Sequence, residues 1–188
     1  MGSGRVGVEI DAAHVAYERL IEPTLEEAGL LVSTGEARYV ANVVLDYPLT
    51  WAFSRLERLN SIVRARTVVL TQASHPVYLD CIASYHVSGV VNSTDEPAIL
   101  GGVYAAANAQ KTHQWRSSLT YMELRVSRLL LQGEDTQAVA RQLSISSKTV
   151  NAHVSNVLGK LGCDSRAQLV ALILGATSEA GSARVAVE

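Results

Sequence analysis

The sequence predicts an α/β domain followed by an all-α domain. Up to Ala109, short apolar runs alternate with helix-like segments, which is typical of a mostly parallel sheet covered by helices on both faces. From Leu119 onward, short helical segments with capping residues follow one another. The chain has 188 residues, of which 48% are hydrophobic and 18% charged, so it is globular and long enough for two small domains.

The α/β domain is expected at residues 5–109, with a parallel five-stranded sheet in a flavodoxin-like, doubly wound arrangement. Strands are expected at residues 5–10, 30–33, 43–46, 67–71 and 89–91, and helices at residues 14–28, 51–63, 76–85 and 97–109. Pro23 lies within the first helical segment, so we expect a kink or a break there. Residues 34–42 form a segment that looks too short for a full helix.

The all-α domain is expected to begin at a capping box. Thr120 is followed three residues later by Glu123, and Leu119 and Leu124 flank the pair as a hydrophobic staple. The apolar run of this helix stops at Gly133, a residue suited to a left-handed helix end. Two further caps follow in the sequence.

Asp135 can cap a short helix at residues 136–143, and Ser165 with Gln168 offers a second capping box for a helix at residues 166–174. Between them lies the segment 144–162, SISSKTVNAHVSNVLGKLG, with an apolar stripe at helical spacing. Successive short helices with tight turns, including an amphipathic and basic one, have helix-turn-helix geometry.

The polar face of segment 144–162 carries no carboxylate. Opposite the apolar stripe lie Lys148, Asn151, Ala152 and Ser155, and along one flank lie Thr149, His153, Asn156 and Lys160. Small, hydrogen-bonding and cationic side chains without acidic ones suit close approach to a polyanion. The same face could also be an ordinary solvated surface, and His153 could be a buried packing residue.

The run LTYMELRVSRLLLQGEDTQAVARQLSISSKTVNAHVSNVLGKLG resembles the LuxR-type DNA-binding domain of NarL/FixJ response regulators, whose pattern is close to LTxRE…G…IAxxLxIS…TVxxH…KLG. The resemblance implies a four-helix helix-turn-helix domain at residues 119–176 whose TVxxH helix lies in the major groove of promoter DNA. It places Asn151, Ala152 and Ser155 at base edges. Phosphate contacts are implied for Lys148, Thr149, His153 and Lys160.

Two positions depart from the family pattern. Met122 stands where the family usually has Arg, and Asn151 stands where it often has Lys. Because Asn can bond an adenine edge bidentately, an altered base preference is one hypothesis.

The resemblance also implies a receiver domain in front of the helix-turn-helix. A receiver carries two acidic residues after its first strand, a phosphoacceptor Asp after the third, a Ser or Thr after the fourth and a Lys after the fifth. Here Asp11 matches one acid, Asp46 the phosphoacceptor and Thr71 the hydroxyl, but the Lys position holds Ser93 and no lysine precedes Lys111. Since phosphoryl transfer needs Mg²⁺ and a cation, the sequence predicts a degenerate receiver that ordinary aspartyl phosphorylation does not control.

Binding of a small molecule or dimerisation could then control the activity of the protein, and the sequence does not identify such a ligand. Mg²⁺, held by Asp11 and Asp46, is expected only if the receiver pocket works, and no other cofactor is expected. Two alternatives remain: a conventional response regulator phosphorylated on Asp46, and a dimerising interaction protein that no longer binds DNA.

The remaining segments suggest assembly. Residues 110–118 are polar and are expected to form the interdomain linker, and residues 177–188 a disordered tail. The last helix is more apolar than one face requires, and in the family this helix is a dimer contact. The expected dimer residues, for a homodimer or for a heterodimer with a related regulator, are Leu169, Val170, Leu172 and Ile173.

Charge and cysteine content exclude several other classes. Residues 116–175 contain seven Lys or Arg against four Asp or Glu, whereas the rest of the chain has nine against fourteen, so the basic part coincides with the expected DNA-binding domain. Cys81 and Cys163 stand far apart without ligand spacing, which indicates neither a disulfide framework nor a metal site. Apolar stretches such as residues 169–174 are far shorter than the roughly 20 residues of a membrane span. We therefore expect a cytoplasmic transcription regulator and not an enzyme.

Overall fold

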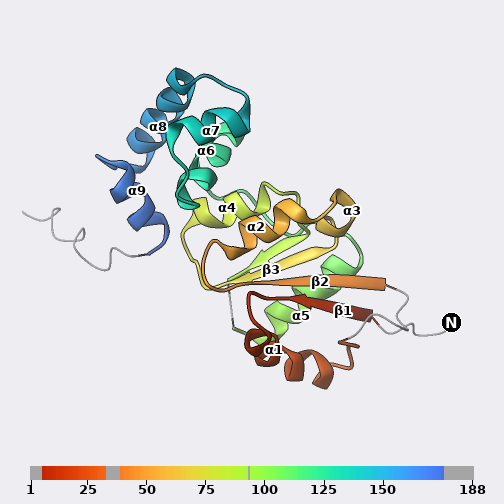
Figure 1. Cartoon of the computed structure of the whole chain (residues 1–188). Helices are drawn as coiled ribbons and strands as arrows, with labels where there is room; N and C mark the ends of the chain where they lie inside the picture. Colours follow the sequence, from red (N-terminus) through yellow and green to blue (C-terminus); the bar gives the residue numbers. More distant parts are fainter. Residues whose placement is uncertain (1–5, 33–38, 93, 176–188) are drawn as a thin grey trace, which may run out of the picture. The chain divides into compact units, whose positions relative to one another are not determined.

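The computed structural model describes residues 6–32, 39–92 and 94–175 (Figure 1). The chain divides into two compact units, Met1–Ser117 and Ser118–Glu188, and each unit is considered by itself. The expected tail at residues 177–188 and Ser93 lie outside the described residues. Within the described residues, no helix is both long and apolar enough to cross a membrane.

The first unit is built on a parallel sheet whose strands follow the order β1-β2-β3-β4. The strands are β1 (Val6–Asp11), β2 (Tyr39–Asp46), β3 (Thr67–Thr71) and β4 (Gly89–Val91). Val43 of β2 is paired with Val68 of β3, which aligns Asp46 with Thr71 at the carboxyl ends of these strands.

The expected strand at residues 30–33 is reduced to an isolated bridge between Leu31 and Gly7. The Val8 N–H donates to the Leu31 carbonyl at 2.7 Å, and the Leu31 N–H donates to the Val6 carbonyl at 3.1 Å. Among the described residues the sheet therefore has four strands, one fewer than predicted, because only a single bridge forms at Leu31. Leu31 still lies outside β1, so the crossover order is that of a flavodoxin-like, doubly wound sheet.

Helices cover both faces of the sheet (Figure 1). On one face lie α1 (Val15–Glu27) and α5 (Glu96–Ala107), and on the other lie α2 (Trp51–Arg58), α3 (Ser61–Arg64) and α4 (Pro76–Ala83). Val43 belongs to the core beneath α1 and α5, and the next residue, Val44, points to the opposite face. Because both residues are fully buried, the sheet is apolar on both sides.

Two helix predictions are corrected by the structure. Of the kink or break expected at Pro23, the break is absent, because α1 continues through this residue and the buried Ile21 and Leu25 on either side hold the helix together. The kink stays a prediction. The single helix expected at residues 51–63 is divided at Leu59, because Asn60 caps a new turn by accepting a hydrogen bond from the Val63 N–H at 3.0 Å.

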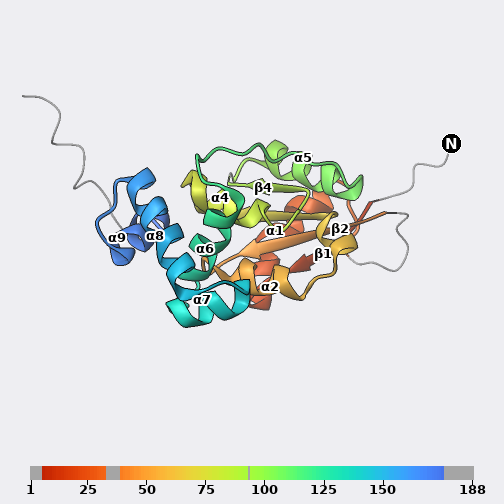
Figure 2. The same cartoon turned by 90° about the horizontal axis from the view of Figure 1, so that it is seen from above.

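The second unit consists of α6 (Tyr121–Leu131), α7 (Thr136–Leu143), α8 (Ser147–Leu161) and α9 (Arg166–Ile173), which group together in Figure 2. The predicted capping box at Thr120 and Glu123 is confirmed, since each side chain accepts the other residue's backbone N–H. Asp135 caps α7 as predicted.

The second predicted capping box is shifted by one residue. Ser165 caps α9 by accepting from the Gln168 N–H at 3.1 Å, as predicted. However, the Gln168 side chain accepts from the Asp164 N–H at 2.7 Å and not from Ser165.

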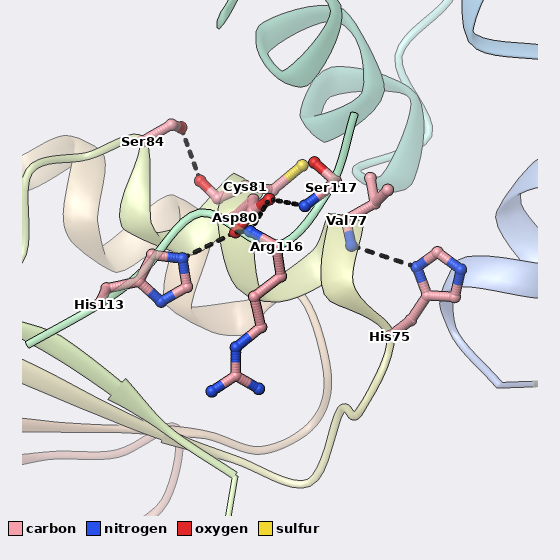
Figure 3. A network of polar contacts seen from close by, with 8 residues as sticks. All are labelled: His75, Val77, Asp80, Cys81, Ser84, His113, Arg116 and Ser117. Carbon is pink, nitrogen blue, oxygen red and sulfur yellow. Dashed lines mark hydrogen bonds and ion pairs between the residues drawn. The ribbon is translucent and has the colours of Figure 1, made fainter. Parts of the chain in front are cut away.

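The segment expected to be the interdomain linker is bound to the first unit as far as Ser117. Asp80 on α4 is fully buried, and its carboxylate accepts hydrogen bonds from the backbone N–H groups of Arg116 and Ser117, the latter at 2.7 Å. His113 Nε2 lies 2.7 Å from Asp80 Oδ1. Figure 3 shows the guanidinium of Arg116 pointing away from this carboxylate. We call the group Asp80, His113, Arg116 and Ser117 the Asp80 clasp.

Candidate DNA-binding surface and receiver pocket

The polar face of α8 is exposed as the sequence predicts. Ser146 caps the helix by accepting from the Thr149 N–H at 3.0 Å, and Val150, Val154 and Val157 are buried. The residues on the opposite side are all exposed: Lys148, Asn151, Ala152 and Ser155. Because these four side chains are exposed, they are free to meet DNA bases; the contacts themselves stay predictions.

The flank of α8 is less uniform than expected. Thr149 and Asn156 are exposed. His153 is half-buried, which is intermediate between a DNA-contacting residue and a buried packing residue. The ammonium group of Lys160 lies 2.7 Å from the Glu123 carboxylate and 3.2 Å from the Ser118 carbonyl oxygen. A phosphate contact by Lys160 would therefore compete with an ion pair inside the domain.

The ion pair of Lys160 stabilises a buried acid. The Glu123 side chain is 4% exposed and that of Lys160 is 35% exposed. Burial acts to raise the pKa of Glu123, but the hydrogen bonds from Lys160 and Thr120 outweigh it and hold the pKa below its ordinary value of 4.5. Glu123 thus joins the helix cap of α6 to the carboxyl end of α8.

Replacing Lys160 by Met should destabilise the helical unit by about 1–3 kcal/mol at neutral pH, because it leaves Glu123 buried without its cation. Because the pKa of Glu123 is depressed on folding, its contribution to stability is present above 4.5 and is lost as the pH falls through the folded-state pKa. This acid-side loss should disappear in Lys160→Met. Chemical unfolding at several pH values measures it, with Lys148→Met on the same helix as the control; equal effects of both substitutions would contradict the assignment.

Asn151 is held by a residue that the sequence did not single out. Arg166, the first residue of α9, donates from Nη2 to Asn151 Oδ1 at 2.9 Å and from Nη1 to Thr136 Oγ1 at 2.8 Å. Thr136 is the first residue of α7, so the guanidinium joins three helices beside the exposed face of α8. The amide oxygen of Asn151 already has a partner before any ligand binds.

The expected dimer helix α9 is partly used by its own domain. Leu169 and Ile173 are each 1% exposed, so they belong to the core of this unit and cannot reach a partner. Val170 and Leu172 are half-buried and keep accessible surface. Assigning all four residues to a dimer contact is therefore corrected to Val170 and Leu172, for which the contact stays a prediction.

The receiver pocket brings Asp46 and Thr71 together, as expected, but closes around Asp46. This carboxylate is 1% exposed. Its Oδ2 accepts from the Tyr78 hydroxyl at 2.7 Å and from the Thr71 hydroxyl at 2.9 Å, and its Oδ1 accepts from the Ala52 N–H at 3.0 Å. The Tyr78 oxygen in turn accepts from the Thr50 N–H at 2.6 Å.

Burial determines the protonation of this pocket. Burial raises the pKa of Asp46, although the hydrogen bonds from Tyr78, Ala52 and Thr71 oppose that rise. Burial, together with the adjacent Asp46 carboxylate, also raises the pKa of the Tyr78 hydroxyl far above its ordinary value. Tyr78 therefore stays a neutral donor, and both oxygens of Asp46 are occupied.

The second expected acid of the pocket has a cationic partner. Arg55 on α2 places Nη2 2.7 Å from Asp11 Oδ2. Among the described residues, no group of three or more metal-ligating side chains gathers. Arg55 lies against one oxygen of Asp11, and both oxygens of Asp46 accept hydrogen bonds from protein groups, so Mg²⁺ would have to displace these partners to bind here.

A pocket of about 950 Å³, lined in part by Asp46 and Thr71, opens at the carboxyl ends of the strands and along α1. Its lining is mostly apolar, with Leu20, Leu45 and Ile99 among the residues that form it. Tyr17 and Tyr47, which also line it, meet edge to face with ring centroids 4.7 Å apart. Among the described lining residues, Asp46 is the only ionisable carboxyl group, so the pocket carries little charge.

The important residues that the sequence reading missed are Arg55, Tyr78, Asp80 and Arg166. Only Asp80 had a local signal, since it is the single acid within the apolar helix PVYLDCIA. A buried acid of this kind usually has a hydrogen-bonding partner elsewhere in the chain.

Comparison with known proteins gives matches to both units. Residues 117–173 match the family described as bacterial regulatory proteins, luxR family. The spore germination protein GerE of Bacillus subtilis is 42% identical over 65 residues, which are 35% of this chain and 88% of GerE. The Fimbriae Z protein of Escherichia coli is 27% identical over 147 residues, covering 67% of this chain and 69% of that protein. For several other curated relatives the chain spans 29% of their length or less.

The fold is shared with a solved structure. RcsB from Salmonella enterica serovar Typhimurium, bound to promoter rprA, superposes with a TM-score of 0.56 at 19% identity, over 91% of this chain and 98% of RcsB. Similarity at this identity concerns the fold, which in both proteins joins a doubly wound sheet to a helical domain.

Proposed function

This chain belongs to the LuxR family of bacterial regulatory proteins, and from that premise we propose that it is a sequence-specific transcription regulator whose receiver-like domain is not controlled by ordinary aspartyl phosphorylation. The observation that carries the DNA-binding part is the exposed, carboxylate-free face of α8. That face presents Lys148, Asn151, Ala152 and Ser155 on a helix whose other side is locked into the domain core.

The proposed mechanism places α8 in the major groove. An α-helix fits that groove, and base edges there are distinguished by hydrogen bonds and methyl contacts. Asn151, Ala152 and Ser155 would meet bases, while Lys148, Thr149 and His153 would hold the phosphates. Lys160 would join them only by leaving its ion pair with Glu123. RcsB, which shares the fold, is described on promoter DNA, and this supports the placement.

The test of this function is selection of binding sites from a library of random duplexes by the full chain at low ionic strength. Lys148→Ala should weaken binding to selected and random DNA alike, and should lower the slope of log affinity against log salt by about one. Asn151→Ala should mainly relax base preference. A chain that selects no sequence, or variants that leave occupancy untouched, would favour the alternative of a dimerising interaction protein.

The closed environment of Asp46 supports the atypical form of control. A phosphoryl donor must approach a carboxylate oxygen in line, and three hydrogen-bond donors hold the two oxygens of this buried group. Arg55 pairs with Asp11, so Mg²⁺ would have to compete with a guanidinium for that acid. The rival proposal, a conventional response regulator phosphorylated on Asp46, requires this whole arrangement to open.

Treatment with acetyl phosphate and Mg²⁺ should therefore leave the mass of the protein and its affinity for selected DNA unchanged. Intact-protein mass spectrometry measures the first quantity and fluorescence anisotropy the second. Asp46→Asn is the matched control, because any phosphoryl group that appears in the unmodified chain and is absent from this variant lies on Asp46. Such a group, together with tighter DNA binding, would decide for the conventional regulator.

Dimerisation and ligand binding complete the proposal. Two copies on a symmetric site would combine their binding energies, with Val170 and Leu172 of α9 as the contact, in a homodimer or with a related regulator.

The pocket of about 950 Å³ beside Asp46 has the size of a small-molecule site. This role assigns no catalytic step to the chain and places it in the cytoplasm with the chromosome.

A further inference from the structure

We propose that Arg166 fixes the side-chain amide of Asn151 so that this residue meets DNA as a hydrogen-bond donor and selects guanine, not adenine, at the base pair it contacts. The inference rests on the proposed DNA-binding function and specifies the base preference of the same surface. It replaces the adenine hypothesis that the residue type alone suggests.

The orientation of the amide follows from the chemistry of its partner. A guanidinium has N–H donors and no acceptor, so the Asn151 atom that lies 2.9 Å from Arg166 Nη2 must be the oxygen Oδ1. Arg166 is itself held from a second side, since its Nη1 donates to Thr136 Oγ1 at 2.8 Å. Two anchors on one rigid, planar group restrict rotation of the Asn151 amide.

This orientation has a consequence for base recognition. Bidentate reading of adenine requires Asn to accept from the adenine N6 amino group through Oδ1 while it donates to N7. The Oδ1 atom has a second lone pair, but an adenine amino group that used it would share this acceptor with the Arg166 guanidinium and would bring its own positively polarised hydrogens against that cation. Guanine offers two acceptors, O6 and N7, on the same edge, and both suit the Nδ2 hydrogens of Asn151 and the adjacent cation.

The competing interpretation is that Arg166 simply contacts a phosphate. Arg166 is half-buried, so part of its guanidinium could reach the DNA backbone. A phosphate contact would contribute equally on every sequence and independently of Asn151. If Arg166 instead positions Asn151, its effect on base preference must depend on the presence of Asn151.

The experiment determines site preferences of the full chain from a randomised duplex library, for the unmodified protein and for Asn151→Ala, Arg166→Ala, Arg166→Lys and the double variant Asn151→Ala with Arg166→Ala. The contacted base pair is the one at which Asn151→Ala loses preference. Arg141→Ala is the charge control, because Arg141 is an exposed cation on α7. Thermal unfolding checks that each variant is folded.

The unmodified chain should prefer guanine over adenine at that position by about ten-fold. Arg166→Ala should remove this preference or reverse it toward adenine, while its affinity for random DNA falls no more than in Arg141→Ala. In the Asn151→Ala background, Arg166→Ala should have no further effect on preference. If Arg166→Ala does not fold, Arg166→Lys decides, since lysine keeps the charge but cannot hold two partners in one plane.

Three results would overturn the inference. The first is an adenine preference in the unmodified chain, and the second is an unchanged guanine preference in Arg166→Ala and Arg166→Lys. The third is a loss of affinity in Arg166→Ala that is equal on all sequences and is also seen in the Asn151→Ala background. In each of these cases the chain still selects DNA, so the proposed function stands. A chain that selects no sequence at all removes the proposed function, and this inference with it.

Discussion

Replacing Ala152 by Glu should reduce the affinity of the chain for its selected DNA by about 100-fold, corresponding to roughly 3 kcal/mol of like-charge repulsion. Ala152 is exposed at the centre of the face that lies opposite the buried valines of α8. Glu is a good helix former, so the substitution adds a carboxylate without disturbing the helix. Fluorescence anisotropy with a selected duplex at fixed salt measures the loss.

The matched control is Ala98→Glu on α5, which makes the same change of charge at an exposed position in the other unit. Its effect should be a few-fold at most, because it alters only the net charge of the chain. Equal losses of DNA affinity in both variants would mean that the net charge of the chain, and not the position of Ala152, causes the loss. No loss in Ala152→Glu would mean that another surface binds DNA.

Replacing Asp80 by Ala should destabilise the first unit by about 3–5 kcal/mol, because it removes the acceptor of the Asp80 clasp and leaves its buried donors unpaired. The carboxylate is fully buried and accepts from the backbone N–H groups of Arg116 and Ser117. Its loss should also free the segment 110–117. Chemical unfolding measures the first effect.

Limited trypsin digestion measures the second effect, since trypsin cleaves after Lys111 and Arg116. Cleavage there should accelerate strongly in Asp80→Ala under native conditions. His113→Ala is the graded control, because it removes one side chain of the clasp and keeps both backbone hydrogen bonds; its effects should be smaller. An unchanged digestion rate in Asp80→Ala would show that other contacts hold the segment.

Local features of this fold could be predicted from the sequence because each depends on neighbouring residues. The capping box joins Thr120 and Glu123 across one helical turn, and the stripe of Val150, Val154 and Val157 repeats at helical spacing. Pro23 shows the limit of such rules, because burial of Ile21 and Leu25 maintains a helix that the local preference would interrupt.

The details of the site could not be predicted, since they join distant positions. Tyr78 reaches Asp46 across 32 positions of the chain, and His113 reaches Asp80 across 33. Even Arg166, only 15 positions from Asn151, meets it because a turn brings the first residue of α9 beside α8. The sequence showed that the receiver pocket lacks its Lys and predicted the Thr71 hydroxyl there, but it gave no sign that the Tyr78 hydroxyl also covers Asp46.

Because the Asp80 clasp retains the chain as far as Ser117, and the capping box of α6 begins at Thr120, hardly more than two residues remain as a tether between the two units. Each extended residue adds at most about 3.5 Å of reach. Two copies that dimerise through the first unit could therefore place their α8 helices over only a narrow range of half-site spacings. The operators of this regulator should accordingly tolerate base substitutions between their halves far better than insertions or deletions there.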